Sequence, residues 1–445
     1  QDRQATATTH PEPTPEGTKT RKKVLFPSFG RIPGSHPMSC SASSESPELP
    51  TTDDDARGSG KRKRTESRFQ HIFGMNPSPL EGPGEAAITE RLSEVYRGRK
   101  PLARLCPHLP EGEDFLESVG VYLYDLNKYE KHLHFVTYGL SQQHGSGSAE
   151  KNCDDDTSGF GFELTFRLPL GRRKPAMDDM SWVCAFLHNL AKYVFETNNS
   201  FSHGHYYDSR SPINLSSDTC NITFVAFHED PVLKSIRTVN GDVTFLQVVG
   251  LTKDEGDAVT SWDALHLLKV LGKRNPCFLT PDHRPSLLED EESAAIVREG
   301  IERDGSTTSV WLVSECAFSS YRPGKATLTA GATAIATLLR GLPSRLLHER
   351  PLRLVAGESG FTTSITFLPG KVGSECTWEV NEELQEVFRG GAYIISLSKS
   401  AVLEMLEKLK AVKGVYTFDQ LSWLTVVVRS SKIIDMAGRL LDIVG

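Results

Sequence analysis

The chain has 445 residues, a formal net charge of −7 at pH 7 and 38% hydrophobic residues. This length exceeds what one hydrophobic core usually fills, so two globular units plus flexible sequence are expected. The mild acidity excludes a whole-chain basic field for nucleic acid, and no apolar run is long enough to cross a membrane. The 8 cysteines include no Cys-x-x-Cys pair, a pattern typical of reduced thiols in the cytosol or nucleus.

The first segment, residues 1–77, is rich in Pro, Ser, Thr, Glu and Arg and lacks aliphatic periodicity. Such a segment buries too little apolar surface to offset chain entropy, so a disordered N-terminal tail is expected. Within it, Lys61, Arg62, Lys63 and Arg64 form a compact basic run. This run is typical of a nuclear import signal or a nucleic-acid patch, and a solvated charge run has the same composition.

Residues 78–320 are expected to form the first domain. Helical spacing of apolar residues predicts helices, and β-rich runs predict strands. The Asn240-Gly241 pair between two β-rich runs predicts a hairpin. The predicted helices are Ala86–Tyr96, Ser181–Phe195, Trp262–Leu271 and Ser293–Ile301, and the predicted strands are Phe115–Tyr124, Leu133–Tyr138, Ser158–Leu168, Ile222–Phe227, Cys277–Thr280 and Val310–Phe318.

The strictest pattern in the chain is the strand predicted at Ser158–Leu168. Apolar residues recur at every second position from Phe160, while Glu163, Thr165 and Arg167 share the other face. This alternation predicts a half-buried strand, and the glycines at its head predict a bulge or a close backbone approach. The preceding Ser141–Thr157 segment is polar and ends acidic, which predicts a surface loop.

The polar stretch Ser319–Lys325 is the expected domain boundary, and residues 321–445 are expected to form the second domain. Helices and strands mix there without strict alternation. The expected fold class is therefore α+β with two mixed-sheet domains. The predicted elements are a helix at Ala332–Arg340 that ends at Gly341, strands at Leu352–Ala356, Thr363–Leu368, Cys376–Val380, Ala392–Leu397 and Leu424–Arg429, a short helix after Asn381, a helix at Ser400–Leu409 and a last helical stretch to Ile443.

An acidic run, Asp154, Asp155 and Asp156, ends the predicted surface loop. Hard cations want several oxygen ligands, so this run could hold a divalent cation. It lacks the glycine and the distal glutamate of a calcium loop. A solvated acidic loop is therefore favoured, and such a loop offers a negative surface to a basic peptide.

Two His-x-His pairs, His132 with His134 and His203 with His205, are the other candidate metal ligands. Zinc would need three or four such ligands to converge, so packed or surface histidines are favoured. The chain has no Gly-x-Ser-x-Gly, His-Glu-x-x-His, P-loop or dinucleotide motif. No enzymatic activity, no cofactor, no metal and no small-molecule substrate are expected.

Several segments together resemble the Suppressor of fused family, in family order from about residue 86 to about residue 430. The run of matches is specific, although no single match would be. The stronger matches are Ser158–Leu168, Ala191–Phe195, Thr244–Gly250 and Gly300–Ser306, and the looser ones are Leu133–Ser141, Cys316–Phe318, Arg345–His348 and Ser422–Trp423.

The resemblance implies a non-enzymatic clamp made of two Suppressor-of-fused-like domains. The family binds Gli-type zinc-finger transcription factors through a short peptide that adds a strand between the domains. Binding retains the factor in the cytoplasm or represses it in the nucleus, as a negative arm of Hedgehog signalling. The expected protein is thus a cytoplasmic and nuclear corepressor, a monomer that contacts neither nucleic acid nor membrane.

Carried over by position, the resemblance also implies a set of peptide contacts. The chain departs from the family because His144 and polar residues replace the aromatic residues of the peptide-covering loop, so its peptide preference is expected to differ. Two other functions stay open: an immunity-type or other peptide-binding protein of the same fold with an unrelated partner, and a metal-dependent hydrolase. The implied contacts are His144, Asp154, Asp155, Asp156, Leu312, Ser314, Leu346 and Leu347.

Overall fold

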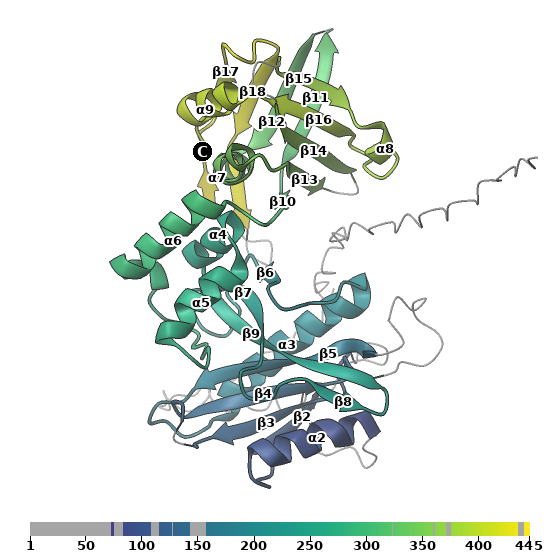
Figure 1. Ribbon diagram of the computed structural model, residues 1–445, viewed down its shortest axis with the longest axis vertical. Coiled ribbons are helices and arrows are strands. Elements are labelled where there is room, and N and C mark those ends of the chain that lie inside the picture. The colour runs from purple at the N-terminus through teal and green to yellow at the C-terminus, as the bar shows by residue number, and fades with distance from the viewer. Residues whose placement is uncertain are drawn as a thin grey trace, which may run out of the picture.

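The computed structural model of the protein describes residues 73–74, 83–107, 115–126, 128–142, 157–322, 324–358, 361–370, 375–434 and 440–445 (Figure 1). The basic run at residues 61–64 lies outside the described residues, as does most of the predicted tail. Phe73 and Gly74, which the prediction placed in that tail, form a short strand that pairs with Pro107 and Cys106.

One mixed sheet forms the base of the first domain. Its strands, in the described residues, are β1 (Phe73–Gly74), β2 (Ala103–Pro107), β3 (Ser118–Tyr124), β4 (His132–Tyr138), β5 (Thr157–Pro169), β6 (Tyr206–Asp208), β7 (Ile222–Glu229), β8 (Ile236–Thr238) and β9 (Gly241–Thr252). They follow the order β1-β2-β3-β4-β5-β9-β7-β6, and β8 pairs with β9. Neighbours are antiparallel except β5 and β9, which run parallel.

Helices cover both faces of this sheet (Figure 1). They are α2 (Pro83–Val95), α3 (Met177–Thr197), α4 (Lys253–Ser261), α5 (Ala264–Arg274), the 3₁₀ turn η1 (Leu287–Glu289) and α6 (Glu291–Asp304). The apolar face of α3 packs on one side of β3, β4 and β5, and α2 packs on the other side. Helices α4, α5 and α6 pack with β7 and β9 and lead toward the second domain.

The second domain is built from two smaller sheets. One contains β10 (Val310–Val313), β13 (Leu352–Glu358), β14 (Phe361–Pro369), β16 (Ala392–Leu397) and β15 (Thr377–Val380), in that order. The other contains β11 (Cys316–Arg322), β12 (Lys325–Gly331), β18 (Leu424–Arg429) and β17 (Gly414–Thr417). The helices are α7 (Ala332–Arg345), η2 (Leu346–His348), α8 (Glu382–Gln385) and α9 (Lys399–Lys408), and a hairpin of β19 (Ser431–Ile434) and β20 (Leu440–Val444) follows.

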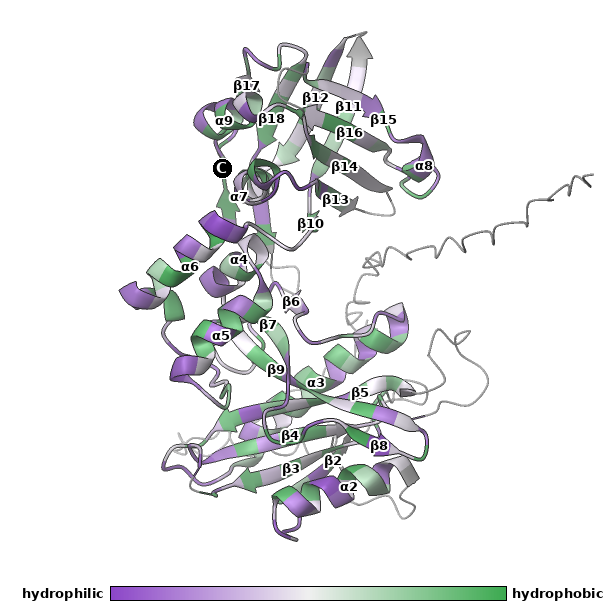
Figure 2. Ribbon diagram, in the orientation of Figure 1, coloured by the Kyte–Doolittle hydropathy of each residue, from purple (hydrophilic) through white to green (hydrophobic). Residues whose placement is uncertain are grey.

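Residues of α7 and α9 and of both sheets share the core of the second domain. Parallel and antiparallel neighbours occur in each sheet of more than two strands: β10 is parallel to β13, and β12 is parallel to β18. The predicted α+β class with two mixed-sheet domains is therefore confirmed. Figure 2 shows hydrophobic and hydrophilic residues in turn along the helices, as amphipathic helices require.

Strand β5 differs from its prediction in one respect. The alternation is present, and the apolar side packs against α3. The other face is also buried, since Glu163, Thr165 and Arg167 are all 0% exposed. The predicted half-buried strand is thus wrong, because β5 lies in the middle of the sheet and its polar face carries buried networks.

The domain change also lies earlier than predicted. Strands β10 and β11 both pair with strands of the second domain, so the first domain ends after α6 and not at residue 320. The predicted strand Val310–Phe318 is two strands in different sheets, divided at Ser314 and Glu315. A continuous apolar run does not show which sheet its residues join.

Three further predictions are wrong. Helix α7 continues through Gly341, which packs against Leu352 and Trp311. Residues 277–280 form no strand: the Cys277 and Phe278 carbonyls accept from the Gln247 side chain, and only Thr280 N–H donates to a strand carbonyl, that of Arg167. The predicted last helical stretch is the β19–β20 hairpin, whose apolar residues alternate too briefly to be distinguished from a helix.

Candidate functional site

Two strands at the junction of the domains have an open edge. Among the described residues, β6 pairs only with β7 at one end of the large sheet, and β10 pairs only with β13 at one end of the five-stranded sheet. Figure 1 shows β6 and β10 at the point where the two domains meet. Within the described residues each edge leaves backbone N–H and C=O groups without a strand partner, which is the feature that accepts an added strand.

Tyr206 connects the two edges at their starting points. It is the first residue of β6, and its side chain packs against the apolar cluster of α4, α5 and α6, near Thr260 of α4 and Thr308, which lies two residues before β10. Burial raises the pKa of Tyr206, so the phenol stays neutral at physiological pH. The position of β6 is therefore tied to the segment that begins the second domain.

The chain crosses between the domains at Gly305 and Ser306. Gly305 has φ +63°, and a Cβ there would lie 2.5 Å from the Ser344 carbonyl oxygen, so only glycine fits this crossing. Ser306 N–H donates to that carbonyl at 2.7 Å, and Arg345 Nη1 donates to the Ser306 carbonyl at 2.6 Å. Ser306 Oγ donates to the Thr260 carbonyl on the other side at 2.6 Å.

An ion pair between Arg340 of α7 and Asp257 of α4 adds a second link. The crossing segment is thus bonded to both domains, which fixes the relative position of the β6 and β10 edges.

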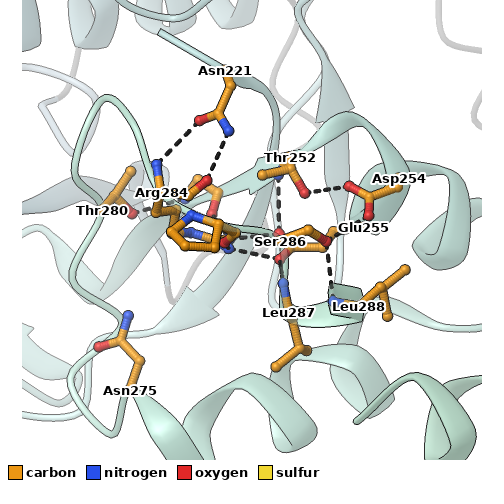
Figure 3. A network of polar contacts seen from close by, with 12 residues as sticks. Asn221, Thr252, Asp254, Glu255, Asn275, Thr280, Arg284, Ser286, Leu287 and Leu288 are labelled. Carbon is orange, nitrogen blue, oxygen red and sulfur yellow. Dashed lines mark hydrogen bonds and ion pairs between the residues drawn. The ribbon is translucent and has the colours of Figure 1, made fainter. Parts of the chain in front are cut away.

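A polar network holds α4, and with it Thr260 and Asp257, against the large sheet (Figure 3). Glu255 is buried, and its carboxylate accepts two hydrogen bonds from the Arg284 guanidinium and one from the backbone N–H of Leu287 at 2.6 Å. Thr252 and Glu255 form a capping box at the start of the helix. Arg284 Nη2 also donates to the Gly250 carbonyl of β9 at 3.0 Å, so the helix is joined to its sheet.

Glu163 of β5 organises the start of the loop that leads to the acidic run. Its Oε1 accepts from the backbone N–H groups of Gly139 and Ser141 at 3.0 and 2.9 Å, and from Ser141 Oγ at 2.6 Å. Its Oε2 accepts from Thr137 Oγ1 at 2.6 Å. Burial raises the pKa of Glu163, and these hydrogen bonds oppose the shift. Glu163 of β5 therefore holds Ser141 in place, just before the segment that leads to the acidic run.

Gly159 brings the two ends of that loop together. It has φ +57°, and a Cβ there would lie 2.4 Å from the Gln142 carbonyl oxygen. Phe160 N–H donates to the Leu140 carbonyl at 2.9 Å, and the β5–β9 register shifts between Thr157 and Phe162. The predicted bulge and close backbone approach are both confirmed.

We expect Gly159→Ala to destabilise the fold more than Gly171→Ala does. Both glycines have positive φ, but nothing lies within 4 Å of a Cβ at Gly171. The control, Gly171→Ala, should lower the free energy of unfolding by about 1 kcal/mol, the cost of the left-handed backbone alone. Gly159→Ala should cost about 2 kcal/mol more, because the methyl group would overlap backbone oxygens. Chemical denaturation of both variants measures the difference, and equal losses would show that the loop ends separate without cost.

A second network fills the rest of the polar face of β5. The Arg167 guanidinium donates to both carboxylate oxygens of Asp230, at 2.6 and 2.7 Å. Its Nη1 donates to His132 Nε2 at 3.0 Å, which assigns the His132 proton to Nδ1, 2.6 Å from the Glu130 carbonyl. Its Nε donates to Gln247 Oε1 at 3.2 Å. Arg167 thus connects β4, β9 and the segment after β7.

Burial and the nearby Arg167 charge keep the two histidines of this network neutral. They lower the pKa of His132 to about 3 and that of His134 to about 4. Burial alone would raise the pKa of Asp230, but Arg167 outweighs it and holds this pKa well below its usual range. The two histidines are buried, packed residues, one of the two placements that the sequence favoured: His132 contacts Arg167, and His134 Nε2 lies 3.3 Å from Asp230 Oδ2.

This network predicts a loss of stability in mild acid. An unfolded histidine titrates near pH 6.5 and the folded ones near 3 and 4, so between these values the unfolded chain binds more protons. The free energy of unfolding should therefore fall as the pH drops from 7 to 4.5, by about 2 to 3 kcal/mol per histidine. Asp230 contributes to this loss only below about pH 4, where the unfolded carboxyl protonates.

Urea denaturation at several pH values measures this dependence. His134→Gln should flatten the slope by about one proton, while His283→Gln, at an exposed histidine, should leave the slope unchanged. Parallel pH profiles for the two variants would contradict the assignment.

Residues 116–285 match the family model of the Suppressor of fused protein. Over 186 residues the chain is 34% identical to the mouse Suppressor of fused homolog and 33% identical to the human one. This region of the chain is therefore similar to the Suppressor of fused family. The match covers 40% of this chain and 38% of each curated relative, so the chain aligns with little more than a third of their length.

The crystal structure of Drosophila Suppressor of Fused extends the likeness to the fold of both domains. It aligns with a TM-score of 0.60 over 79% of this chain and 99% of that chain, at 19% identity. The second domain, which lies beyond the family match, thus has a Suppressor of fused fold. The resemblance stated from the sequence is confirmed.

The structure places only some of the implied contact residues. Leu312 lies in β10 and packs against an apolar cluster on the outer face of the sheet, and Ser314 is exposed just after that strand. Leu347 is half-buried, whereas Leu346 is 5% exposed and belongs to the core, so its side chain faces inward. Four further residues lie outside the described ones: His144, Asp154, Asp155 and Asp156.

The sequence analysis missed β6, Arg284 and the role of Glu255. Thr252-Lys-Asp-Glu255 is a capping-box sequence that could have predicted α4, while a three-residue strand leaves no periodic signal. In the part of the chain that the structure describes, no three His, Cys, Asp or Glu side chains gather as metal ligands. No helix in that part is long and apolar enough to cross a membrane.

Proposed function

We propose that this protein is a non-enzymatic regulator that binds a short peptide of a Gli-type zinc-finger transcription factor as an added strand between β6 and β10. The observation that carries the proposal is the meeting of two open sheet edges, one from each domain, at a crossing bonded to both. Two such edges can pair with both sides of one extended peptide. The match of residues 116–285 to the Suppressor of fused family model supports this use of the site.

In β10, the backbone N–H and C=O groups of alternate residues point away from β13 and can pair with an added strand. Arg353 N–H donates to the Ser309 carbonyl, so the residues that pair with β13 are Ser309, Trp311 and Val313. By alternation, the N–H and C=O groups of Val310 and Leu312 point to the open edge. Next to that edge lies an apolar cluster of Val355, Phe388 and Ala392, with Val310 and Leu312 packed on it. An added peptide would place alternate apolar side chains there.

The acidic run gives the proposed site its charge preference. Glu163 and Gly159 hold the described residues on either side of the segment that carries Asp154, Asp155 and Asp156. These carboxylates would attract a basic or neutral peptide and repel an acidic one. With the basic run Lys61–Arg64 as an import signal, a monomer of this protein would retain the factor in the cytoplasm or repress it in the nucleus, as a negative regulator of Hedgehog signalling.

Isothermal titration of the full chain with a synthetic peptide that contains Ser-Tyr-Gly-His-Leu tests the proposal. Micromolar or tighter binding is expected, and a scrambled peptide should not bind. Asp155→Arg with Asp156→Arg should weaken binding at least tenfold and leave the melting temperature nearly unchanged, since surface substitutions seldom cost much stability.

The same titration separates this proposal from the other use of the fold. A folded chain that ignores the peptide would refute the Gli assignment and leave an unrelated partner, as in an immunity-type protein. Binding that survives the double substitution would refute the role of the acidic run.

A further inference from the structure

The five-stranded sheet of the second domain has a second open edge, on the side opposite β10. The strand order β10-β13-β14-β16-β15 places β15 last, and its pairing is with β16 alone in the described residues. Asn381 N–H donates to the Ala392 carbonyl at 2.8 Å, which fixes the alternation of this antiparallel ladder. The backbone groups of Trp378 and Val380 therefore point away from β16.

This edge is unusually acidic. Glu379 lies in β15, and four more glutamates precede or follow that strand. All five are exposed, and among the described residues no ion pair involves any of them. The exposed cation nearest in sequence is Arg389. Figure 2 shows β15 and α8 as hydrophilic elements on the outer side of the domain. The glutamates are Glu375, Glu379, Glu382, Glu383 and Glu386.

Apolar side chains are exposed within this acidic surface. Val380 is 40% exposed and Val387 is 59% exposed. Side chains on a strand alternate between faces, so Glu379 points to one face and Trp378 and Val380 to the other. A strand paired with β15 would thus meet a carboxylate on one face and apolar side chains on the other.

We infer that β15 and the glutamates around it form a second docking edge, for an extended segment of a partner protein in which Lys or Arg alternates with apolar residues. Such a segment would hydrogen-bond to the backbone of Trp378 and Val380. Its cations would lie beside Glu379, and its apolar residues beside Val380, an arrangement that stabilises cross-strand pairs. Nucleic acids and acidic peptides would be repelled. The edge and the Gli peptide site use different strands at opposite ends of the sheet, and α8 also packs on the apolar cluster next to β10 through Leu384.

A fluorescein-labelled ten-residue peptide of alternating Lys and Val is the probe, titrated by anisotropy against the full chain. A peptide of the same composition, with all Val before all Lys, keeps the charge and removes the alternation. The alternating peptide should bind at least tenfold more tightly. Equal binding of the two peptides, or no binding at millimolar concentration, would overturn the inference.

Two substitutions test the edge itself. Val380→Pro removes one outward N–H group and leaves the β15–β16 ladder intact. The triple substitution Glu379→Lys, Glu382→Lys and Glu383→Lys reverses the charge. Each should weaken binding of the alternating peptide at least tenfold.

The matched control reverses three exposed glutamates of α6, Glu291→Lys, Glu292→Lys and Glu299→Lys, with the same change in net charge. This control should bind the alternating peptide with an affinity within twofold of that of the unsubstituted chain. The double substitution Asp155→Arg with Asp156→Arg should do the same. An equal loss in the α6 variant would show non-specific attraction and overturn the inference. If circular dichroism shows that Val380→Pro does not fold, the two charge variants still decide the outcome.

Discussion

Asp230→Asn is expected to lower the free energy of unfolding by about 3–5 kcal/mol, because it leaves the buried Arg167 charge without its carboxylate. Arg167 and Asp230 are both fully buried, and the same carboxylate accepts from Thr165 Oγ1 at 2.8 Å and from the N–H of Leu233 at 2.9 Å. Urea denaturation at pH 7 measures the loss. The effect should exceed that of any single surface substitution in this protein.

Asp125→Asn is the matched control, since Asp125 also pairs with an arginine, Arg99, but at the surface. Exposed ion pairs contribute little, so this variant should lose less than about 1 kcal/mol. Arg167→Met combined with Asp230→Leu removes both charges and should recover part of the loss. Similar losses for the buried and the surface variant would show that water reaches the Arg167 network.

Leu312→Pro should abolish measurable binding of the Gli-type peptide, with at least a hundredfold loss of affinity. The substitution removes the outward N–H group in the middle of the β10 edge, while Trp311 and Val313 keep their bonds to β13. Isothermal titration measures the loss, and thermal melting checks that the fold persists.

Leu312→Ala separates the backbone from the side chain in this experiment. It keeps the N–H group and removes the contact with the apolar cluster around Val355 and Phe388. A loss of about tenfold is expected, since truncating one contact residue seldom costs more than 1–2 kcal/mol of binding. If Leu312→Pro binds the peptide as well as the alanine variant does, strand addition at β10 is refuted.

The elements that the sequence predicted well are those with a sustained period. The alternation of β5 and the helical stripe of α3 each extend over enough residues to give one answer, and both elements are confirmed. The polar face of β5 could not be predicted as buried, because the partner of Arg167 lies 63 residues later in the chain. A charged residue on a strand predicts a solvent-exposed side chain unless its buried partner is known.

The candidate site was harder to predict than the fold for a similar reason. Leu312 was placed through the family resemblance, while β6, the other side of the site, has 3 residues and no pattern. The domain crossing depends on Gly305 and Ser306, whose partners lie in α4 and α7. Sequence spacing carries no information on which distant segments share a hydrogen bond.

The shortness of β6 and β10 sets the length of what the site can recognise. With 3 residues on one side and 4 on the other, a bound peptide can pair over only about four residues. A partner would therefore need no folded domain at the contact, only a brief linear motif in an otherwise unconstrained segment. The same shortness makes each edge a poor template for another copy of this chain, so the site can remain open without promoting self-association.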